Sequence, residues 1–284
     1  MVKPDEFPQQ QQKHQPGVEK AMNPEPEVIR KNYKGSEKLK GKVALITGGD
    51  SGIGRSVAAH FAREKADVAI VYLPREKVDA EKTREMVEAE GQKCLLLEGD
   101  VTDEAFCENA INKTLSFLGS LNILVNNAGV QFPKEEVIEV NNEQFRKTFE
   151  VNIFPFHCFT LEALNHMKAG DTIINTTSIT AFRGSAHLVD YASTKGAILS
   201  YSRSLAKNLA EKGIRVNTVA PGPIWTPLIP SSFEKVKKFG QKAAMGRAGQ
   251  PSEVAPAYVF LASEDGSYVT GQVIHVNGGE FIGA

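Results

Sequence analysis

The sequence has few cysteines, and their spacing suits neither a disulfide framework nor a metal site. The three cysteines, Cys94, Cys107 and Cys158, are odd in number, widely separated and include no C-x-x-C pair. Free thiols of this kind are typical of a reducing compartment. We therefore expect a cytoplasmic protein without a bound metal ion.

Long apolar runs are absent as well. No run approaches the ~20 residues that a membrane-spanning helix needs. The first residues, MVKPDE, lack the apolar core of a signal peptide. These absences predict that the chain has no membrane partner.

A strong charge of either sign is also missing. The net charge is −1 and the pI about 6.6, which is not the basic footprint of a nucleic-acid-binding protein. Four lysines between residues 34 and 42 are explained more simply by a solvated tail. A chain of 284 residues with 41% hydrophobic residues can bury a sizeable globular core.

Residues 1–40 differ in composition from the rest of the chain. Five of the 14 prolines fall within the first 26 residues, beside the run Gln9–Gln12, and few residues there are apolar. Such a segment buries too little surface to offset its ordering entropy. We expect a tail that is disordered or laid over a neighbour, whose deletion leaves the domain 41–284 folded and active.

From Lys42 onward, short apolar runs alternate with longer stretches of helical spacing. The runs are β-branched and continuously apolar, as expected for strands covered on both faces. They are 43–47, 68–72, 94–98, 123–125, 172–176, 216–220 and 273–276. The predicted helices are 54–65, 78–90, 104–118, 143–167, 191–212 and 253–262. This alternation predicts a single α/β domain, a doubly wound, Rossmann-type parallel sheet of seven strands with helices on both faces.

The glycine-rich stretch Thr47–Arg55 joins the first strand to the first helix. Glycines allow backbone N–H groups to approach phosphate oxygens, and the helix N-terminus adds partial positive charge. The spacing T-G-x-x-x-G-x-G matches neither the commoner dinucleotide fingerprint nor a P-loop. An ordinary glycine-rich turn is the alternative, and motifs elsewhere in the chain are needed to distinguish it from a phosphate-binding turn.

Tyr191 and Lys195 lie four residues apart in a predicted helix, so they share one face. A nearby ammonium favours the phenolate and would make the tyrosine a usable acid or base near neutral pH. Ser178, at the end of the fifth strand, could hydrogen-bond a substrate oxygen, although a helix cap would also explain it. Because ligands of such sheets bind beyond the carboxyl ends of the strands, these side chains are candidate site residues.

Taken together, these motifs resemble the short-chain dehydrogenase/reductase family in its compact single-domain branch. The resemblance runs from about residue 40 to the C-terminus, and the tail is loosely similar to a bacterial group related to glucose/ribitol dehydrogenase-like proteins. The motifs that carry it are Thr47–Gly54, Asp100, 126–129, Asn152, Ser178, Tyr191, Lys195, 221–222 and 277–279.

The resemblance implies a hydride transfer between NAD or NADP and a small alcohol or carbonyl substrate. Tyr191 would be the acid/base, Lys195 would lower its pKa and hold the ribose, Ser178 would orient the substrate oxygen, and Asn152 would anchor a water of a proton relay. The residues implied to bind the cofactor are Gly48, Asp50, Ser51, Gly52, Ile53, Gly54, Tyr72, Leu73, Asp100, Val101, Asn127, Ala128, Gly129, Tyr191, Lys195, Pro221, Gly222, Ile224 and Thr226.

The choice between NAD and NADP stays open in the sequence. Family members that use NAD usually carry an acid directly after the second strand, and here the chain reads Tyr72-Leu73-Pro74-Arg75. Arg75 and Arg55 could attract a 2′-phosphate, whereas Ser51 is neutral where NADP users often have a basic residue. We predict use of both cofactors.

The segment 224–249 contains the only tryptophan, Trp225, with phenylalanines and lysines, so it is either a substrate lid or a pair of surface helices. His187 is near the site by its position. The resemblance and the apolar content of the long helices predict a homotetramer. The alternatives are a catalytically silent nucleotide-sensing protein on the same fold and a sugar-nucleotide epimerase, which usually needs a larger C-terminal region.

Overall fold

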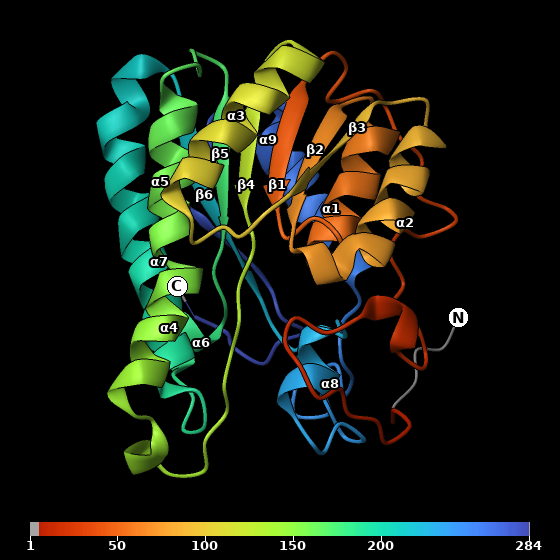
Figure 1. The fold of residues 1–284 in the computed structure, drawn as a ribbon, viewed down its shortest axis with the longest axis vertical. Helices are drawn as coiled ribbons and strands as arrows, with labels where there is room; N and C mark the ends of the chain where they lie inside the picture. Colours follow the sequence, from red (N-terminus) through yellow and green to blue (C-terminus); the bar gives the residue numbers. More distant parts are fainter. Residues whose placement is uncertain (1–5, 284) are drawn as a thin grey trace.

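The computed structural model describes residues 6–283, and seven strands form one parallel sheet in the order β3-β2-β1-β4-β5-β6-β7 (Figure 1). β1 pairs with both β2 and β4, so the connections leave β1 in opposite directions. A crevice therefore opens at the carboxyl ends of β1 and β4, where α/β sheets bind their ligands. The strands are β1 Val43–Thr47, β2 Asp67–Tyr72, β3 Cys94–Glu98, β4 Ile123–Asn126, β5 Thr172–Thr176, β6 Arg215–Pro221 and β7 Val273–Val276.

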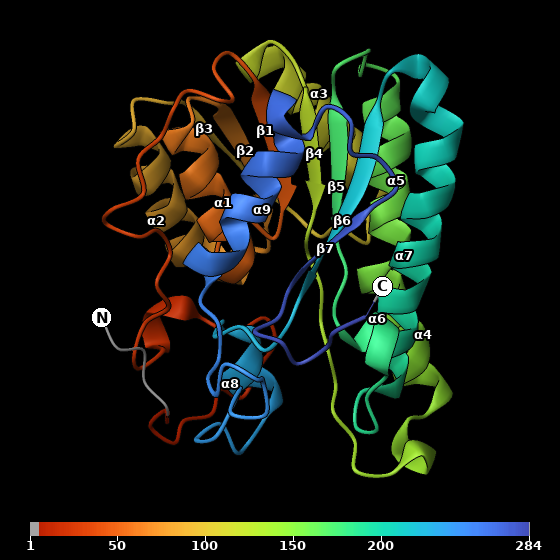
Figure 2. The ribbon, with the colours of Figure 1, turned by 180° about the vertical axis from the view of Figure 1, so that it is seen from behind.

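Helices cover both faces of the sheet (Figures 1 and 2). α1, α2 and α9 pack on one face in a core that includes Phe61 and Tyr258, and α3, α5 and α7 pack on the other around Phe159. The α-helices are α1 Gly52–Arg63, α2 Lys77–Glu88, α3 Glu104–Leu118, α4 Asn142–Asn152, α5 Phe154–Leu164, α6 Thr180–Arg183, α7 Val189–Leu209, α8 Leu228–Ser232 and α9 Pro251–Ala262. Single turns of 3-10 helix are η1 Glu19–Ala21, η2 Pro74–Glu76, η3 Val137–Glu139, η4 Ala210–Lys212 and η5 Glu264–Gly266.

The predicted fold class is confirmed, and the predicted strands fall within one residue of the observed bounds at either end. The reason is visible in their burial, since every residue of β1, β4 and β5 is buried. A strand covered on both faces has to be apolar throughout, which makes it easy to recognise in sequence. Among residues 6–283, no helix is both long and apolar enough to cross a bilayer.

The helix predicted over 143–167 is wrong as a single element, because Ile153 separates α4 from α5. Pro155 explains the break: it has no N–H to donate to the carbonyl four residues earlier, and its ring crowds that turn. The break leaves Asn152 at the C-terminal end of α4. The short helices α6 and α8 were not predicted, because four or five residues carry no clear periodicity.

The N-terminal segment lies against the carboxyl end of the sheet, beside α8 (Figures 1 and 2). Its backbone bonds to the segment after β6, with Phe7 N donating to Lys237 O at 3.0 Å and Gln12 N to Pro230 O at 2.7 Å. A small third core joins the two segments and consists of Phe7, Met22, Trp225, Ile229, Val236 and Ala248. The tail was expected to be disordered or laid over a neighbour, and residues 6–34 lie instead over the body of their own domain.

Candidate active site

A cavity of about 780 Å³ opens at the carboxyl ends of the strands. Of the predicted site residues, Gly54 and Asn152 do not line it; the others do, and they come from the ends of β1 to β6 and from α7. The sheet thus brings together residues that are up to 178 positions apart, from Gly48 to Thr226. The cavity is large enough for a dinucleotide together with a small substrate.

The glycine-rich turn has the backbone that a pyrophosphate-binding turn requires. Gly48 and Gly52 have φ of 63° and 53°, in the left-handed region where a side chain is strained. A Cβ on Gly54 would lie 1.9 Å from the Gly48 carbonyl oxygen, so only glycine fits there. α1 begins at Gly52, which directs its N-terminus into the cavity. These residues fit a nicotinamide dinucleotide, with N–H groups of the turn as phosphate donors beside the N-terminus of α1.

Side-chain hydrogen bonds tie the glycine-rich turn to the end of β4. The Thr47 hydroxyl accepts from the backbone N–H of Asn127 at 2.9 Å and of Ala128 at 3.2 Å. The Asn127 amide in turn donates to the carbonyls of Thr47 and Gly48 at 3.2 and 3.1 Å. The two walls of the cavity that flank the switch point are therefore rigidly connected.

Ser178, Tyr191 and Lys195 meet on one side of the cavity. The Ser178 side chain lies close enough to the Tyr191 hydroxyl to favour its ionised form. Lys195 Nζ donates to the Thr176 carbonyl at 3.0 Å and lies 5.3 Å from the centre of the Tyr191 ring. The i, i+4 spacing on α7 explains this placement, since both side chains leave the same face of the helix.

Burial moves the pKa values of the tyrosine and the lysine toward their neutral forms. Desolvation raises the pKa of Tyr191 to about 12, a rise that the neighbouring Ser178 side chain opposes. Desolvation lowers the pKa of Lys195 to about 7. The protein alone therefore does not produce the low tyrosine pKa that the resemblance implies, and a further positive charge in the cavity is needed to stabilise a phenolate.

Asn152 lies behind the cavity wall. Its amide Oδ1 accepts from Val130 N at 2.8 Å, and its Nδ2 donates to Val130 O at 2.9 Å and to the Thr194 hydroxyl at 3.2 Å. A Cβ on Gly129 would lie 3.3 Å from Asn152 Oδ1. Asn152 thus holds the loop after β4 against α7, close to Lys195.

At the end predicted for adenosine, the cavity is lined by Leu73, Arg75, Asp100 and Val101. Asp100 Oδ1 accepts from both the N–H and the hydroxyl of Thr102 at 2.9 Å, which leaves its other carboxylate oxygen for a ligand. Arg75 is exposed and lines the cavity, as a contact to a 2′-phosphate requires.

Arg55 does not reach the cavity, so its predicted attraction for a 2′-phosphate is wrong. Its guanidinium is 5% exposed and is enclosed by the carboxylates of Glu19 and Asp79 and by the Thr83 hydroxyl. Helical periodicity explains this: Arg55 lies one turn inside α1, on the side that faces α2 rather than the cavity.

The absence of an acid directly after Tyr72 does not leave this wall without carboxyl groups. Asp50 and Glu76 both line the cavity and are both buried. Glu76 accepts from Leu73 N at 2.9 Å, and within the described residues Asp50 Oδ2 has no hydrogen-bond partner. Burial raises the pKa of Asp50 to about 6 and that of Glu76 to about 8.

The segment after β6 forms the opposite wall. Thr226 approaches the glycine-rich turn closely, because a Cβ on Gly52 would lie 3.1 Å from the Thr226 Cβ. Ile224 forms an isolated bridge with Gly249, which closes the segment 224–249 into a lobe. Trp225 is fully buried and stacks on Phe7, so it does not offer its ring to a substrate.

Sequence reasoning missed several residues that line the cavity. Lys13, His14, Gln15, Pro16 and Gly17 come from the N-terminal segment, and Arg183 pairs with Glu280 at 3.0 Å across the rim. His187 lines the cavity as its position suggested, and its ring lies 3.6 Å from the Glu135 carboxylate. The tail carries no motif or periodicity, so no signal in that stretch pointed to the site.

Comparisons with known proteins agree with this geometry. A family model described as enoyl-(acyl carrier protein) reductase matches residues 48–280. An uncharacterised oxidoreductase of Bacillus subtilis, YhdF, is 58% identical over 275 residues, 96% of this chain and 95% of that protein. The glucose and ribitol dehydrogenase of Daucus carota is 47% identical over 289 residues, 99% of both chains.

Solved structures of similar fold include dehydrogenases and reductases. The structure of a short-chain dehydrogenase from Burkholderia cenocepacia in complex with NADP matches with a TM-score of 0.80 and 29% identity, covering 86% of this chain and 99% of that one. Similar structures also include complexes with NADH and with NADPH. The chain belongs to the short-chain dehydrogenase/reductase family and is an NAD(P)-dependent oxidoreductase.

Proposed function

We propose that this enzyme moves a hydride between NAD(P) and a small alcohol or carbonyl compound, with Tyr191 as the acid/base. The observation that carries the proposal is that Ser178, Tyr191 and Lys195 line one cavity, with Lys195 Nζ 5.3 Å from the centre of the Tyr191 ring. When bound, the dinucleotide would supply the hydride in its reduced form, or accept it in its oxidised form, which also carries a positive charge. That charge favours the phenolate that burial alone disfavours.

The protein residues then have separate tasks. Ser178 holds the substrate oxygen next to the phenol, so that the proton transfers over one hydrogen bond. Lys195, fixed by its bond to the Thr176 carbonyl, directs its remaining N–H donors toward the cavity. Asn152 positions the loop 129–130, and its predicted part in a water relay stays a prediction.

The proposed substrate class is a sugar, a polyol or an aldehyde. The name of the carrot relative supports the first two. The part of the cavity beside the 224–249 lobe combines apolar rings with cations, namely Phe233, Phe239, Lys238 and Lys242. This mixture suits a small polar substrate that has to be partly desolvated.

We also propose a homotetramer in the cytoplasm. Phe145, Phe154 and Leu161 are exposed on α4 and α5, which supports burial of this surface by another copy. The three cysteines are free thiols, as a reducing compartment requires. Sedimentation of only a 30.9 kDa species at micromolar concentration would contradict the tetramer.

A silent nucleotide sensor is not favoured, because Ser178, Tyr191 and Lys195 are all present and lie together. The discriminating experiment is a screen of polyols, sugars and aldehydes with NAD(H) and NADP(H), monitored by the absorbance of the reduced nicotinamide. We expect turnover with at least one class. Tight cofactor binding without turnover of any class would favour the sensor.

A further inference from the structure

Residues 13–19, which we call the strap, cross the cavity from the loop after β4 to the loop after β6. Residues 13–17 line the cavity. On one side, the Gln15 amide Nε2 donates to Gln131 O at 2.6 Å, and Gln15 Oε1 accepts from Gln131 N at 3.1 Å. On the other side, a Cβ on Gly17 would lie 2.5 Å from the Pro227 carbonyl oxygen. The strap therefore touches both walls between which the dinucleotide has to lie.

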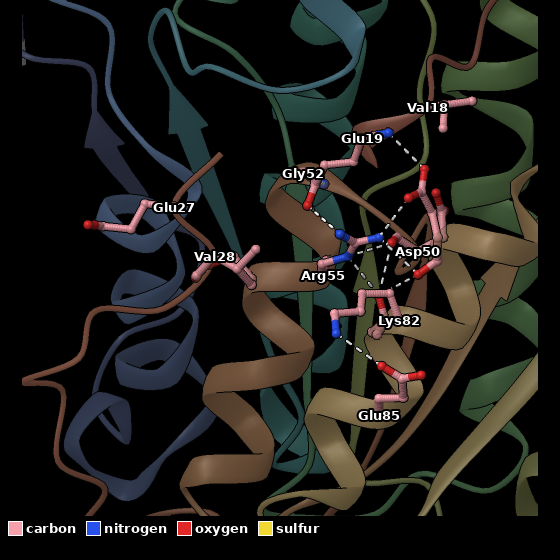
Figure 3. Close-up of polar contacts among 12 residues, drawn as sticks. Val18, Glu19, Glu27, Val28, Asp50, Gly52, Arg55, Lys82 and Glu85 are labelled. Carbon is pink, nitrogen blue, oxygen red and sulfur yellow. Dashed lines mark hydrogen bonds and ion pairs between the residues drawn. The ribbon is translucent and has the colours of Figure 1, made fainter. Parts of the chain in front are cut away.

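Glu19 anchors the strap to the glycine-rich turn (Figure 3). Glu19 is 2% exposed. Its carboxylate accepts a hydrogen bond at 2.6 Å from the backbone N–H of Gly52, which is the first residue of α1. The same carboxylate pairs with the Arg55 guanidinium, and Glu19 N donates to Asp79 Oδ2 at 2.8 Å. A residue of the tail thus caps the helix whose N-terminus faces the cofactor cavity.

Contacts beyond the strap hold both of its ends. Phe7 stacks on Trp225 with ring centres 3.7 Å apart and planes 8° apart, and Trp225 Nε1 donates to Pro24 O at 2.9 Å. Phe7, Trp225 and Pro24 themselves do not line the cavity. The strap can therefore lift between two fixed ends by breaking the bonds of Gln15 and of Glu19, without unfolding the segments that flank it.

We propose that the strap closes over the bound dinucleotide, with Gln15 as its fastening and Glu19 as a positioning residue for the glycine-rich turn, and that its release limits the rate at which the cofactor leaves. This inference rests on the proposed function only in that the cavity holds NAD(P). Neither Gln15 nor Glu19 takes part in the chemistry. Both act by keeping the cavity closed and the turn in place.

The test is the cofactor dissociation rate, measured by the fluorescence of bound NADPH in stopped flow after mixing with excess NADP. Gln15→Ala should raise this rate about tenfold, because two hydrogen bonds that fasten the strap are lost. Glu19→Ala should raise it by a similar factor, and Glu19→Gln by less, since an amide oxygen still accepts from Gly52 N–H. Hydrogen exchange of the amides in residues 13–19 should slow when NADPH binds.

Gln10→Ala is the matched control. Gln10 pairs with Asn23, accepting from its N–H at 3.0 Å and donating to its carbonyl, but it touches neither the cavity nor the body of the domain through these bonds. A dissociation rate in Gln15→Ala no faster than in Gln10→Ala, or unchanged exchange of residues 13–19, would overturn the strap alone. Failure of the wild-type enzyme to bind either cofactor would overturn the proposed function and the strap together.

Discussion

The cavity has two kinds of wall, and they differ in how the chain builds them. The sheet contributes strand ends that carry recognisable motifs, such as Thr47, Asn127 and Ser178, and Thr47 and Asn127 are hydrogen-bonded to each other. The N-terminal segment contributes a strap that is held mainly by glutamine side chains and by one buried carboxylate, Glu19. The first wall is part of the two large cores, whereas the second depends on a small core of its own.

The two walls separate the stability of the fold from the access of the cofactor to the cavity. The strand-end wall cannot move without disturbing the sheet, so it suits groups whose distances matter for proton and hydride transfer. The strap can open while the sheet stays intact, so it suits the entry and exit of a large cofactor. Substitutions in the two walls should therefore have different effects.

The largest expected effect is on chemistry at the sheet wall. Tyr191→Phe should lower kcat by a factor of at least about 10² while cofactor affinity stays within about twofold, because only the acid/base hydroxyl is lost. Tyr201→Phe, on the same helix but bonded to His157 at 3.0 Å, is the matched control and should stay near wild-type activity. A Tyr191→Phe enzyme that retains more than a few per cent of kcat contradicts the assignment.

The sheet wall could be predicted from sequence, and the strap could not, for physical reasons. A strand buried on both faces must be apolar, and a phosphate-binding turn must contain glycine. The sequence of Val43–Gly54 therefore predicts a buried strand followed by such a turn. The glutamines at positions 10, 12 and 15 instead form hydrogen bonds with backbone groups of Asn23, Val18 and Gln131. No periodicity in the sequence indicates which backbone group each glutamine binds. Composition alone predicts a solvated tail there.

The two corrections within the body of the domain have different origins. Arg55 was a candidate cofactor ligand because of its distance along the chain from the glycines, but its partner Glu19 comes from the tail and could not be foreseen. The break at Ile153 follows from a single proline that the apolar periodicity of 143–167 obscured. Local pattern predicted the elements well, while a long-range contact decided the position of Arg55 and a single proline decided the break at Ile153.

The second prediction compares how a core of the sheet and the third core contribute to the free energy of unfolding. Leu45→Ala, in the middle of β1, should lower the global free energy of unfolding by about 2–5 kcal/mol. Phe7→Ala removes a ring that is only 3% exposed, yet we expect little change in the global value, because the third core opens as a separate unit. Its effect should instead be faster hydrogen exchange in residues 7–24 and 224–249. Equal losses of global stability in both variants would show that the third core unfolds with the sheet.

The third prediction concerns cofactor choice and contrasts two arginines. Arg75→Ala should weaken NADP binding about tenfold more than NAD binding, as loss of a charge-assisted hydrogen bond requires. Arg55→Ala should weaken both cofactors alike, because it disturbs Glu19 and the turn rather than a phosphate contact. Titration calorimetry with both cofactors separates the two. Equal losses for NAD and NADP in Arg75→Ala would place that guanidinium in solvent.

The smallest expected effect is a pH dependence of stability from Glu19. Burial raises the pKa of this carboxyl from 4.5 to about 7, against the opposing attraction of Arg55. The folded state therefore binds the proton more tightly than the unfolded state does. The stabilisation is complete below about pH 4.5 and is lost as the pH rises through about 7. Asp50 and Glu76, whose pKa values are also raised, contribute in the same direction to both the wild type and a Glu19 variant.

Glu19→Gln removes this one titration and leaves the other carboxyls in place. The range from about pH 5 to about pH 8 spans the raised pKa of Glu19. Over this range the wild type should lose about 1–2 kcal/mol of stability relative to Glu19→Gln. Denaturant unfolding of both proteins at each pH gives this difference directly. A difference that stays constant across the range would mean that Glu19 is ionised in the folded state throughout, held by Arg55 and the Gly52 N–H. The tail would then be tied to the glycine-rich turn as firmly as the strand ends are tied to one another, and the contrast between the two walls would disappear at this residue.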